Sequence, residues 1–321
     1  MEFRYSKEVD SSCYETRGLG GGIPLRTHEN SLAEVKGTLQ AQRDWSRYVR
    51  PVGEYRGGLG GRYSMICVTI PECLPDRLEV VSYANEFALL YDDEMEKLDL
   101  QSPPSSREIL EVFGDDALEN QVDADARPEK RLQARLFSRM LAIDSARAAV
   151  AMKAWAASVQ LAARTRLTTF ATLDEYIPAR VVDVGELIWF GMVTFGMALS
   201  IPPEEHDLCM ELARPAYIAL GLTNDLFSWE KEREAARRGG QDRVFNAIWV
   251  LMNERGVSEE GARTICSEEI QKQVTKYCVV VEETKANLRL SRDLRTYIEA
   301  LLYSISGNLV WSIHNPRYGS I

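Results

Sequence analysis

Two groups of oxygen-bearing side chains in this sequence have the spacing of one helix face. The first lies in LLYDDEMEKLD, where Asp92 and Glu96 are four residues apart and Asp93 stands beside them. Positions i and i+4 share a face of a helix, so these carboxylates project together. Like charges at this spacing destabilise a helix unless a cation neutralises them. Such hard oxygen ligands suit Mg²⁺, which binds one or two carboxylates together with water and substrate phosphates.

The second group lies in GLTNDLFSWEKE, which contains Asn224, Asp225, Ser228 and Glu232. Asn224, Ser228 and Glu232 follow one another at intervals of four residues and form a stripe along one helix face. An amide oxygen, a hydroxyl and a carboxylate make an all-oxygen chelate that suits a further Mg²⁺ ion. The neighbouring Lys231 could meet a phosphate oxygen.

Either group alone has a simpler explanation, as a solvated acidic face or as a capped surface helix. A third acidic cluster, Asp115, Asp116 and Glu119, shows the difference. Polar sequence surrounds it and Gly114 precedes it, so we expect a solvated loop there. The two motifs instead each end an apolar stretch. Together they predict one metal-dependent site built by two separate helices.

The elements that position these motifs are predicted to be helices. From Asp76 onward apolar residues recur at steps of three and four, and no alternating strand pattern or repeat is found, which predicts an all-α domain of about ten helices over residues 1–321. Residues 1–62 are expected to be partly irregular, with the glycine clusters Gly18–Gly22 and Gly57–Gly61 as flexible connections. Residues 101–127 are expected to form a loop. Helical sequence is found at 129–164, 174–200, 204–236, 241–254, 258–286 and 291–313.

Composition excludes several classes of protein. The 321 residues are 45% hydrophobic and carry a net charge of −10, which disfavours nucleic acid as a partner. The three histidines, His28, His206 and His314, have no neighbouring ligand set, which argues against a zinc enzyme or a histidine triad.

The distribution of cysteine and apolar residues favours a cytoplasmic protein. The 6 cysteines have no CxxC spacing and are expected to be reduced thiols. The N-terminus has no apolar signal-peptide core. The most apolar stretch, Leu187–Ile201, is shorter than the roughly 20 residues that span a membrane. We therefore expect a buried core helix there, and no stable membrane insertion.

The two motifs resemble those of class I terpene synthases, an aspartate-rich DDxx(D/E) motif and an NDxxSxxxE motif that face each other across a helical barrel. Arg180, in YIPARVVDVGE, resembles the diphosphate-sensing arginine of that family. Asp183 resembles its linker residue, and residues 184–185 resemble the helix break of its effector segment. Arg317 and Tyr318 resemble its terminal RY pair, which hydrogen-bonds the diphosphate.

Longer stretches resemble the N-terminal cyclase domains of fungal fusicoccadiene-type diterpene synthases. Two departures are found: Glu96 stands where the family often has aspartate, and these relatives commonly carry a C-terminal prenyltransferase domain. The chain could therefore be a stand-alone enzyme or an excised domain. The stretches that carry this resemblance to the cyclase domains are MEFRYS, EYRGGLGGRYS, PECLPDRLEVVSYANEFALLYDD, YIPARVVDVGELIWFGMVTFG, NAIWVLM and LYSISGNLVWS.

The resemblance implies the α-helical class I terpenoid synthase fold and a Mg²⁺-dependent cyclase with three Mg²⁺ ions. The implied substrate is geranylgeranyl diphosphate, cyclised to a polycyclic, fusicoccane-type diterpene with release of diphosphate. Three alternatives remain open: a sesterterpene cyclase acting on geranylfarnesyl diphosphate, a chain-elongating isoprenyl synthase, and a catalytically silent helical binding protein. Asn224 and Ser228 replace aspartates of the second elongase motif and favour cyclisation. The family also suggests a homodimer and a fused or separate prenyltransferase partner.

The resemblance assigns roles to individual residues. Metal ligands would be Asp92, Asp93, Glu96, Asn224, Ser228 and Glu232, and diphosphate donors would be Arg180, Asn224, Lys231, Arg317 and Tyr318, with Asp183 linking the sensor arginine to the effector segment. Aromatic faces can stabilise a carbocation by about 1–2 kcal/mol each when desolvated. Candidates on the apolar helices are Phe87, Trp189, Phe190, Phe195, Phe227 and Trp311, of which Phe87 and Trp311 are closest in sequence to the motifs.

Overall fold

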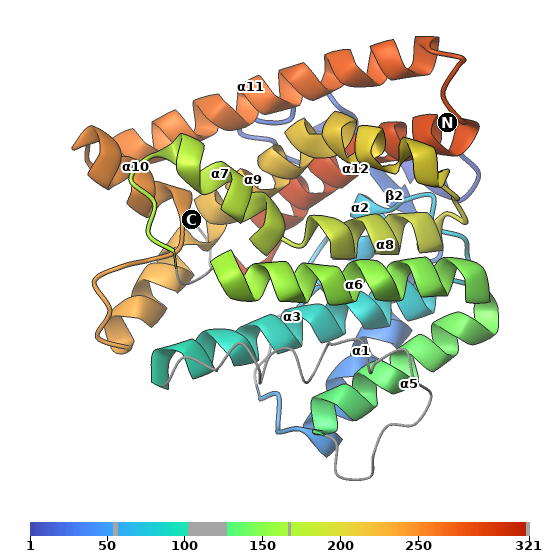
Figure 1. The fold of residues 1–321 in the computed structure, drawn as a ribbon, viewed down its shortest axis with the longest axis horizontal. Helices are drawn as coiled ribbons and strands as arrows, with labels where there is room; N and C mark the ends of the chain where they lie inside the picture. Colours follow the sequence, from blue (N-terminus) through green and yellow to red (C-terminus); the bar gives the residue numbers. More distant parts are fainter. Residues whose placement is uncertain (54–56, 102–126, 166–167, 319–321) are drawn as a thin grey trace.

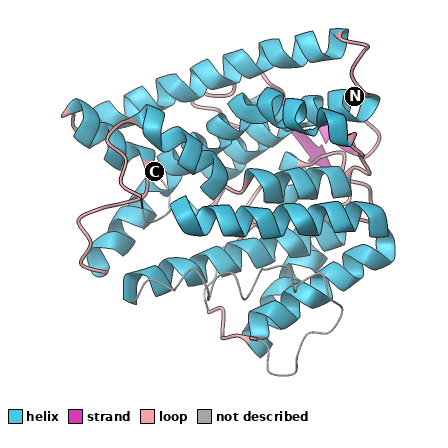
Figure 2. Cartoon of the chain, viewed as in Figure 1, coloured by secondary structure: helices cyan, strands magenta, loops and turns pink. Residues whose placement is uncertain are grey.

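Long helices form nearly the whole structure, and two short strands pair near one edge (Figures 1 and 2). The strands β1 (Ser6–Glu8) and β2 (Arg26–His28) are antiparallel. The all-α prediction is thus confirmed, with this small ribbon added. The computed structural model describes residues 1–53, 57–101, 127–165 and 168–318, with the side chains of all of these except 94–101 and 163–165.

The helices pack in pairs that cross one another around a shared core. Helix α9 packs against both α12 and α11, and α11 lies along one edge of the molecule (Figure 1). Further pairs are α1 with α3, and α6 with α8. The helices are α1 (Ser31–Tyr48), α2 (Met65–Thr69), α3 (Leu78–Gln101), α5 (Pro128–Ile143), α6 (Ser145–Thr165), α7 (Leu173–Asp183), α8 (Glu186–Gly196), α9 (His206–Arg238), α10 (Ala247–Arg255), α11 (Glu259–Ala286) and α12 (Arg292–His314).

The ends of three elements meet on one side of the molecule. The C-terminal end of α3 and the C-terminal part of α9 lie on the left-hand side of Figure 1, and the turn that follows α12 packs against α9. A short 3₁₀ turn, Pro316–Tyr318, follows α12 there. The two acidic motifs and the RY pair therefore belong to the same end of the helical bundle.

The break between α7 and α8 lies where the sequence predicts it. Gly185 has φ 81°, a left-handed conformation that glycine adopts without steric cost, and α8 starts at the next residue. From Trp189 to Gly196 every residue of α8 is buried, so the prediction of a core helix in this apolar stretch is confirmed. In the described residues no helix has the length and apolar character needed to cross a bilayer.

Residues 1–62 are predicted to be partly irregular, and within them the structure contains one long helix, α1, that is not expected from the sequence. Asn30 caps this 18-residue helix by accepting a hydrogen bond from the Ala33 amide at 3.3 Å. Only two apolar side chains of this helix, Ala41 and Trp45, are buried, so few apolar residues in the sequence mark its inner face. Gly37 lets it approach α3, since a Cβ there would stand 2.1 Å from the Glu79 carbonyl oxygen.

The two glycine clusters are not the flexible connections that the sequence suggests. In the first, the Gly18 carbonyl accepts a hydrogen bond from Gln271 Nε2 at 3.1 Å, so this cluster docks on α11. Gly21 has φ 56° and leaves no room for a side chain, because a Cβ would stand 2.5 Å from Val274 Cγ1. In the second, Gly57 and Gly58 are buried. Both clusters are parts of the packed structure.

Other boundaries follow from local polar contacts. The helical composition of 129–164 conceals a break at Asp144, whose carboxylate accepts from the Arg147 amide at 3.1 Å and pairs with Arg77 at 2.9 Å. Near the next predicted helix, Asn246 caps α10, which begins at Ala247 rather than at 241. Most of the predicted loop 101–127, with the acidic cluster at Asp115, lies outside the described residues.

Candidate active site

Asp93, near the end of α3, contacts two of the predicted diphosphate donors. Arg317 donates to both carboxylate oxygens, at 2.8 Å from Nη1 to Oδ2 and 2.7 Å from Nη2 to Oδ1. Lys231, on α9, donates from Nζ to Oδ1 at 2.9 Å. Asp92 is partly buried beside it, while the side chain of Glu96 lies outside the described atoms. The structure thus joins the first motif to Lys231 and to the RY pair.

The pKa of Asp93 reflects these neighbours. Burial alone would raise the pKa of this carboxyl. The hydrogen bonds and positive charge of Arg317, together with Lys231, outweigh that effect and lower the pKa below its usual value. Asp93 is therefore a carboxylate at neutral pH, in the form that a metal ligand requires.

Asn224, on α9, links the sensor arginine to the terminal tyrosine. Its Oδ1 accepts from Arg180 Nη2 at 2.6 Å, and its Nδ2 donates to the Tyr318 hydroxyl at 2.8 Å. Arg180 also hydrogen-bonds Asp183, the predicted linker residue. Four residues that the sequence assigns to the site thus form one connected network across α7, α9 and the C-terminal turn.

Asp225 is fully buried and supports this network through its contact with Arg180. Its carboxylate lies 2.8 Å from Arg180 Nε, and it accepts hydrogen bonds from the Tyr176 hydroxyl at 2.8 Å and from the Ala247 amide at 3.0 Å. Burial raises the pKa of Asp225 to about 6, despite the opposing effects of Arg180 and Tyr176. Burial would lower the pKa of Arg180, but Asp225 foremost raises it well above its ordinary value. Asp225 therefore holds Arg180, the predicted diphosphate sensor, in place.

Two residues of this network were missed by the sequence analysis. Tyr176 precedes Arg180 by one helical turn on α7, a spacing that could have indicated it. Asn246 donates from Nδ2 to Glu232 Oε2 and to the Asp225 carbonyl oxygen, both at 2.9 Å. An asparagine directly before a predicted helix is a capping signal, but its contact with α9 has no local sequence signature.

The second motif has the properties of a metal site. Ser228 Oγ is buried and interacts with the Glu232 carboxylate. Burial raises the pKa of Glu232, and the charge of Asp225 raises it further. A buried hydroxyl and a carboxylate destabilised by neighbouring negative charge are groups that a bound cation would satisfy. The oxygen donors present therefore fit Mg²⁺.

The fit of these residues to Mg²⁺ depends on the neutral oxygen donors as well as on the carboxylates. In the described part of the chain, His, Cys, Asp and Glu side chains alone form no group of three that could hold a metal ion. A metal site on α9 would therefore use the amide of Asn224 and the hydroxyl of Ser228 together with Glu232.

The predicted cavity aromatics are all buried, in different surroundings. Phe87 packs among Trp45, Tyr91 and Trp155, with ring centroids 5.7, 6.3 and 6.2 Å away. Trp311 lies edge-to-face with Tyr318 at 5.6 Å, which brings it next to the diphosphate donors. The roles of these aromatics stay predictions.

The four other candidate aromatics contact different parts of the structure. Trp189 donates to Ser304 Oγ at 3.0 Å, and Phe190 packs on Tyr297 at 5.2 Å. The face of Phe227 receives Arg17 from the N-terminal segment, 5.5 Å from the ring centroid. Phe195 is completely buried, and Arg77 lies over its ring.

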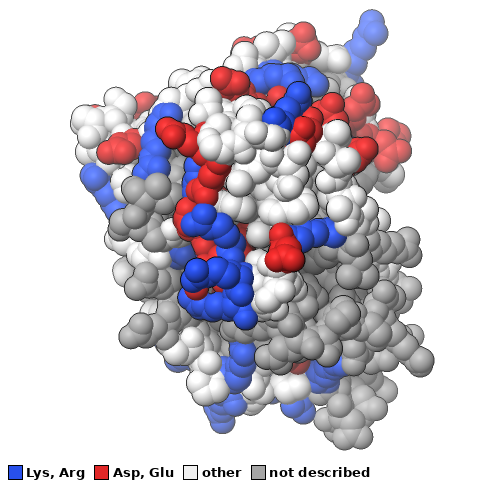
Figure 3. All heavy atoms as spheres, turned by 90° about the vertical axis from the view of Figure 1, so that its left-hand side faces the viewer, with Lys and Arg blue, Asp and Glu red and all other residues white. Residues whose placement is uncertain are grey.

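Charged side chains gather on the face of the molecule that contains these helix ends. Figure 3 shows acidic and basic groups mixed in a band down this face, with basic side chains clustered near its middle. The mixture agrees with the contacts described above, in which arginine and lysine pair with motif carboxylates.

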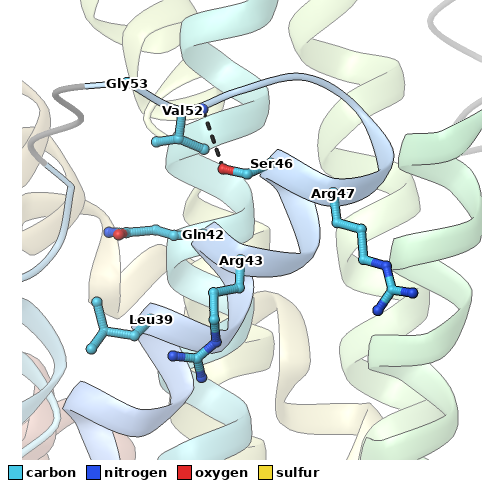
Figure 4. A pocket seen from close by; sticks show the side chains of 7 residues that line it. All are labelled: Leu39, Gln42, Arg43, Ser46, Arg47, Val52 and Gly53. Atoms are coloured by element: carbon cyan, nitrogen blue, oxygen red, sulfur yellow. Dashed lines mark hydrogen bonds between the residues drawn. The ribbon is translucent and has the colours of Figure 1, made fainter.

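A surface pocket lies away from this site, along the outer side of α1. Its volume is about 470 Å³. Figure 4 shows the seven lining residues, which come from α1 and the segment that follows it. They include Arg43 and Arg47 but none of the predicted site residues, so we assign the pocket no part in the chemistry.

The arrangement of helices is that of class I terpene synthases. Aristolochene synthase from Penicillium roqueforti superimposes with a TM-score of 0.62, at 22% identity, over 78% of this chain and 82% of that one. Cucumene synthase gives a TM-score of 0.71 at 14% identity, over 91% of this chain and 98% of that one. These likenesses establish the fold.

The chain belongs to terpene synthase family 2. The model of that family's C-terminal metal-binding region matches residues 85–276, a range that contains both acidic motifs. The metal-binding prediction therefore has the support of the family as well as of the donor set.

Curated fungal proteins are similar over nearly the whole chain. Fusicoccadiene synthase of Phomopsis amygdali is 47% identical over 99% of this chain, and a bifunctional type I diterpene synthase of Aspergillus flavipes is 46% identical over 99%. A bifunctional sesterterpene synthase of Aspergillus aculeatus is 44% identical over 99%. The chain spans less than half the length of these relatives, 45%, 42% and 45% respectively.

Proposed function

We propose that the chain is a Mg²⁺-dependent terpene cyclase that ionises geranylgeranyl diphosphate, cyclises the carbocation to a polycyclic diterpene of the fusicoccane type and releases diphosphate. One observation carries the proposal. Lys231 and Arg317 both donate hydrogen bonds to Asp93, and Asn224 joins Arg180 to Tyr318 at the same end of the bundle. The proposed metal ligands and the proposed anion donors thus come from four separate elements.

The metal ligands proposed are Asp92, Asp93 and Glu96 on α3, and Asn224, Ser228 and Glu232 on α9. Bound Mg²⁺ would neutralise the charge that develops on the leaving diphosphate. Three ions are expected from the family pattern.

The donors of the chain bind and orient the diphosphate. Arg180, Lys231 and Arg317 offer cationic N–H groups, and Tyr318 offers a hydroxyl. Charge-assisted hydrogen bonds of this kind are roughly twice as strong as neutral ones. Because Asp225, Asp183 and Asn224 already fix Arg180, little ordering cost remains when it binds an anion.

Aromatic side chains would protect and stabilise the carbocation after ionisation. Trp311 is the best placed of the candidates, since it contacts Tyr318 directly. Phe87 lies on α3 one and a half turns before Asp92. Each ring contributes on the order of 1–2 kcal/mol to a desolvated cation.

The chain length of the substrate has two candidates. The similar fungal proteins include diterpene synthases and sesterterpene synthases by name, which favour C20 and C25 diphosphates respectively. We propose geranylgeranyl diphosphate first, with geranylfarnesyl diphosphate as the second candidate. Since two of these relatives are bifunctional, we also propose a prenyltransferase as a fused or separate partner.

One assay separates the candidate functions. Purified protein is incubated with Mg²⁺ and C15, C20 or C25 diphosphate, and products are analysed by gas chromatography–mass spectrometry. We expect a cyclic hydrocarbon from the C20 substrate. A cyclic product from C25 alone would replace the diterpene by a sesterterpene. A longer linear diphosphate, formed with added isopentenyl diphosphate, would indicate a chain-elongating enzyme, and no turnover of any substrate would indicate a binding protein.

Site variants test the assignment of the motifs. Asp92→Ala and Asn224→Ala each remove a proposed metal ligand and should abolish product formation. Asp115→Ala changes the third acidic cluster and serves as the control, with activity equal to wild type. Greater damage from Asp115→Ala than from the motif variants would show that the wrong cluster was chosen.

A further inference from the structure

The second glycine cluster lies between the two elements that form the Asp93–Arg317 pair. Gly57 and Gly58 are buried and are hydrogen-bonded both to α3 and to the region at the end of α12. No role in the proposed chemistry accounts for this segment, although its sequence, YRGGLGGRYS, is unusually rich in glycine.

Glu86 holds the segment on the α3 side. The Gly58 amide donates to Glu86 Oε2 at 2.8 Å, and Gln42 on α1 donates to Oε1 at 2.6 Å. Glu86 is completely buried. It precedes Asp93 by seven residues, which places it on the same face of α3, about 10 Å away along the axis. The segment is therefore anchored to the helix that presents the first motif.

Asn315 and Trp311 hold the segment on the C-terminal side. The Gly58 carbonyl accepts from Trp311 Nε1 at 2.9 Å, and the Gly57 carbonyl accepts from Asn315 Nδ2 at 3.1 Å. The other end of the Asn315 amide, Oδ1, accepts from the Arg317 backbone amide at 2.7 Å. One buried asparagine thus connects the glycine segment to the residue that binds Asp93.

Steric contacts explain why the segment is made of glycine. A Cβ on Gly58 would stand 3.0 Å from Asn85 Nδ2 and 3.1 Å from Glu86 Oε2, the oxygen that accepts its own amide hydrogen. A Cβ on Gly60 would stand 2.0 Å from the Tyr63 carbonyl oxygen. A side chain at Gly58 would therefore press on Asn85 and on the carboxylate that accepts the Gly58 amide, and one at Gly60 would require a shift of the backbone.

We propose that the Gly57–Gly58 segment is a positioning device for diphosphate binding, in which Glu86 and Asn315 fix the C-terminal turn relative to α3. The segment sets the separation between Arg317 and Asp93, and Trp311 transmits the same constraint to Tyr318 through their ring contact. Asn315 and Glu86 act through Arg317 and Tyr318 and do not touch the substrate. The inference rests on the proposed function, since it concerns the diphosphate donors of that site.

The test measures binding of inorganic diphosphate to the chain in the presence of Mg²⁺ by calorimetric titration. The variants are Asn315→Ala, Arg317→Ala and the combination of both. Tyr277→Phe is the matched control, because it removes one buried hydrogen bond, 2.7 Å to the Ile298 carbonyl, on a different part of α12. Thermal unfolding is recorded for each variant, so that a loss of fold is separated from a loss of position.

We expect Asn315→Ala alone to weaken diphosphate binding about tenfold. In a chain that already carries Arg317→Ala, we expect the same change to weaken binding by less than a factor of about two. Tyr277→Phe should lower the unfolding temperature and leave binding unchanged. Equal binding by Asn315→Ala and wild type, or the same loss in both backgrounds, would overturn the inference.

A second variant keeps the test valid if Asn315→Ala does not fold. Gly58→Ala retains every polar group, but its added methyl group would crowd the Glu86 carboxylate. We expect the binding of inorganic diphosphate to weaken at least about threefold in this variant. An unchanged affinity in Gly58→Ala overturns the inference. A wild-type chain that binds no diphosphate would instead overturn the proposed function and, with it, this role for the segment.

Discussion

Arg317 and Asp93 form a two-pronged ion pair, with N–O distances of 2.8 and 2.7 Å, although 224 positions separate them in the sequence. Lys231 donates to the same carboxylate at 2.9 Å. A proposed metal ligand therefore holds two proposed diphosphate donors. A diphosphate that takes these donors must replace bonds of comparable strength, so its affinity depends on cations that compensate the carboxylate.

The two-pronged geometry predicts that Arg317→Lys impairs the enzyme although the charge is kept. An ammonium group cannot reproduce the paired N–H donors of a guanidinium. We expect product formation from geranylgeranyl diphosphate to fall between 10- and 100-fold, on the order of 1–3 kcal/mol. Arg233→Lys, in an exposed pair with Glu259, is the control and should leave activity unchanged. Equal loss in the two variants would mean that charge alone, or general destabilisation, is responsible.

The buried pair of Arg180 and Asp225 predicts a large effect on stability. Their side chains are 8% and 0% exposed, so Arg180→Ala would leave a buried carboxylate without its cation. We expect the free energy of unfolding in urea to fall by about 3–5 kcal/mol.

The double variant Arg180→Ala with Asp225→Asn provides the control for that prediction. Because the second change removes the uncompensated charge, its cost should be smaller than the sum of the single changes. Strict additivity would show that the two side chains do not act as a pair. Diphosphate binding should be lost in the double variant as well, since the sensor arginine is absent.

Both motifs could be predicted from the sequence because their residues follow one helix face, a local property that spacing reveals. The core helix after Gly185 is likewise indicated by its apolar run, whereas the break at Gly185 is expected from the family resemblance. Contacts between Asp93 and Lys231 or Arg317 depend on packing of remote segments, and spacing carries no information on them. The family resemblance supplied the RY pair and Arg180 where local physics could not.

The residues that were missed share a different property. Tyr176, Asn246 and Asn315 are neutral and act through other residues, so a helical spacing or a capping position alone does not indicate a role in chemistry. The glycine clusters were misinterpreted because close packing and flexibility give the same local composition. Only the neighbours, such as Val274 at Gly21 and Glu86 at Gly58, distinguish the two cases.

Glu34 predicts a pH dependence of stability that is independent of the active site. This buried carboxyl, in the first turn of α1, accepts hydrogen bonds from the Ile66 and Cys67 amides at 2.8 and 2.7 Å. Burial outweighs these bonds and raises the pKa of Glu34 to about 7. Between the unfolded value of 4.5 and about 7 the folded state binds more protons than the unfolded state, so stability falls as the pH rises through this window.

Urea unfolding of wild type and Glu34→Gln between pH 4.5 and 8 checks this prediction. The difference in unfolding free energy between the two proteins should change across the window by up to roughly 3 kcal/mol, and stay constant above it. Subtraction removes the contribution of the other carboxyl groups, which both proteins share. A difference that does not vary with pH would show that Glu34 is ionised throughout.

Gly221 predicts a separation of activity from stability. It lies on α9, and a Cβ there would stand 3.3 Å from Arg180 Cγ and 3.7 Å from Val184 Cγ1. The methyl group of Gly221→Ala would therefore crowd the Arg180 side chain and shift it. The higher helix propensity of alanine would at the same time stabilise α9 by about 1 kcal/mol. We expect the unfolding free energy to change by less than about 1 kcal/mol, and turnover of the diphosphate substrate to fall about tenfold.

Gly261→Ala in α11 is the matched control, since its nearest neighbours are the side chains of Val257 and Ser258, away from the site. Its activity should equal that of wild type. Steady-state kinetics at saturating Mg²⁺, with urea unfolding on the same preparations, separate the two effects. A Gly221→Ala enzyme of full activity would show that Arg180 tolerates displacement, and one whose activity falls only with its stability would show that the close contact serves packing rather than the placement of the arginine.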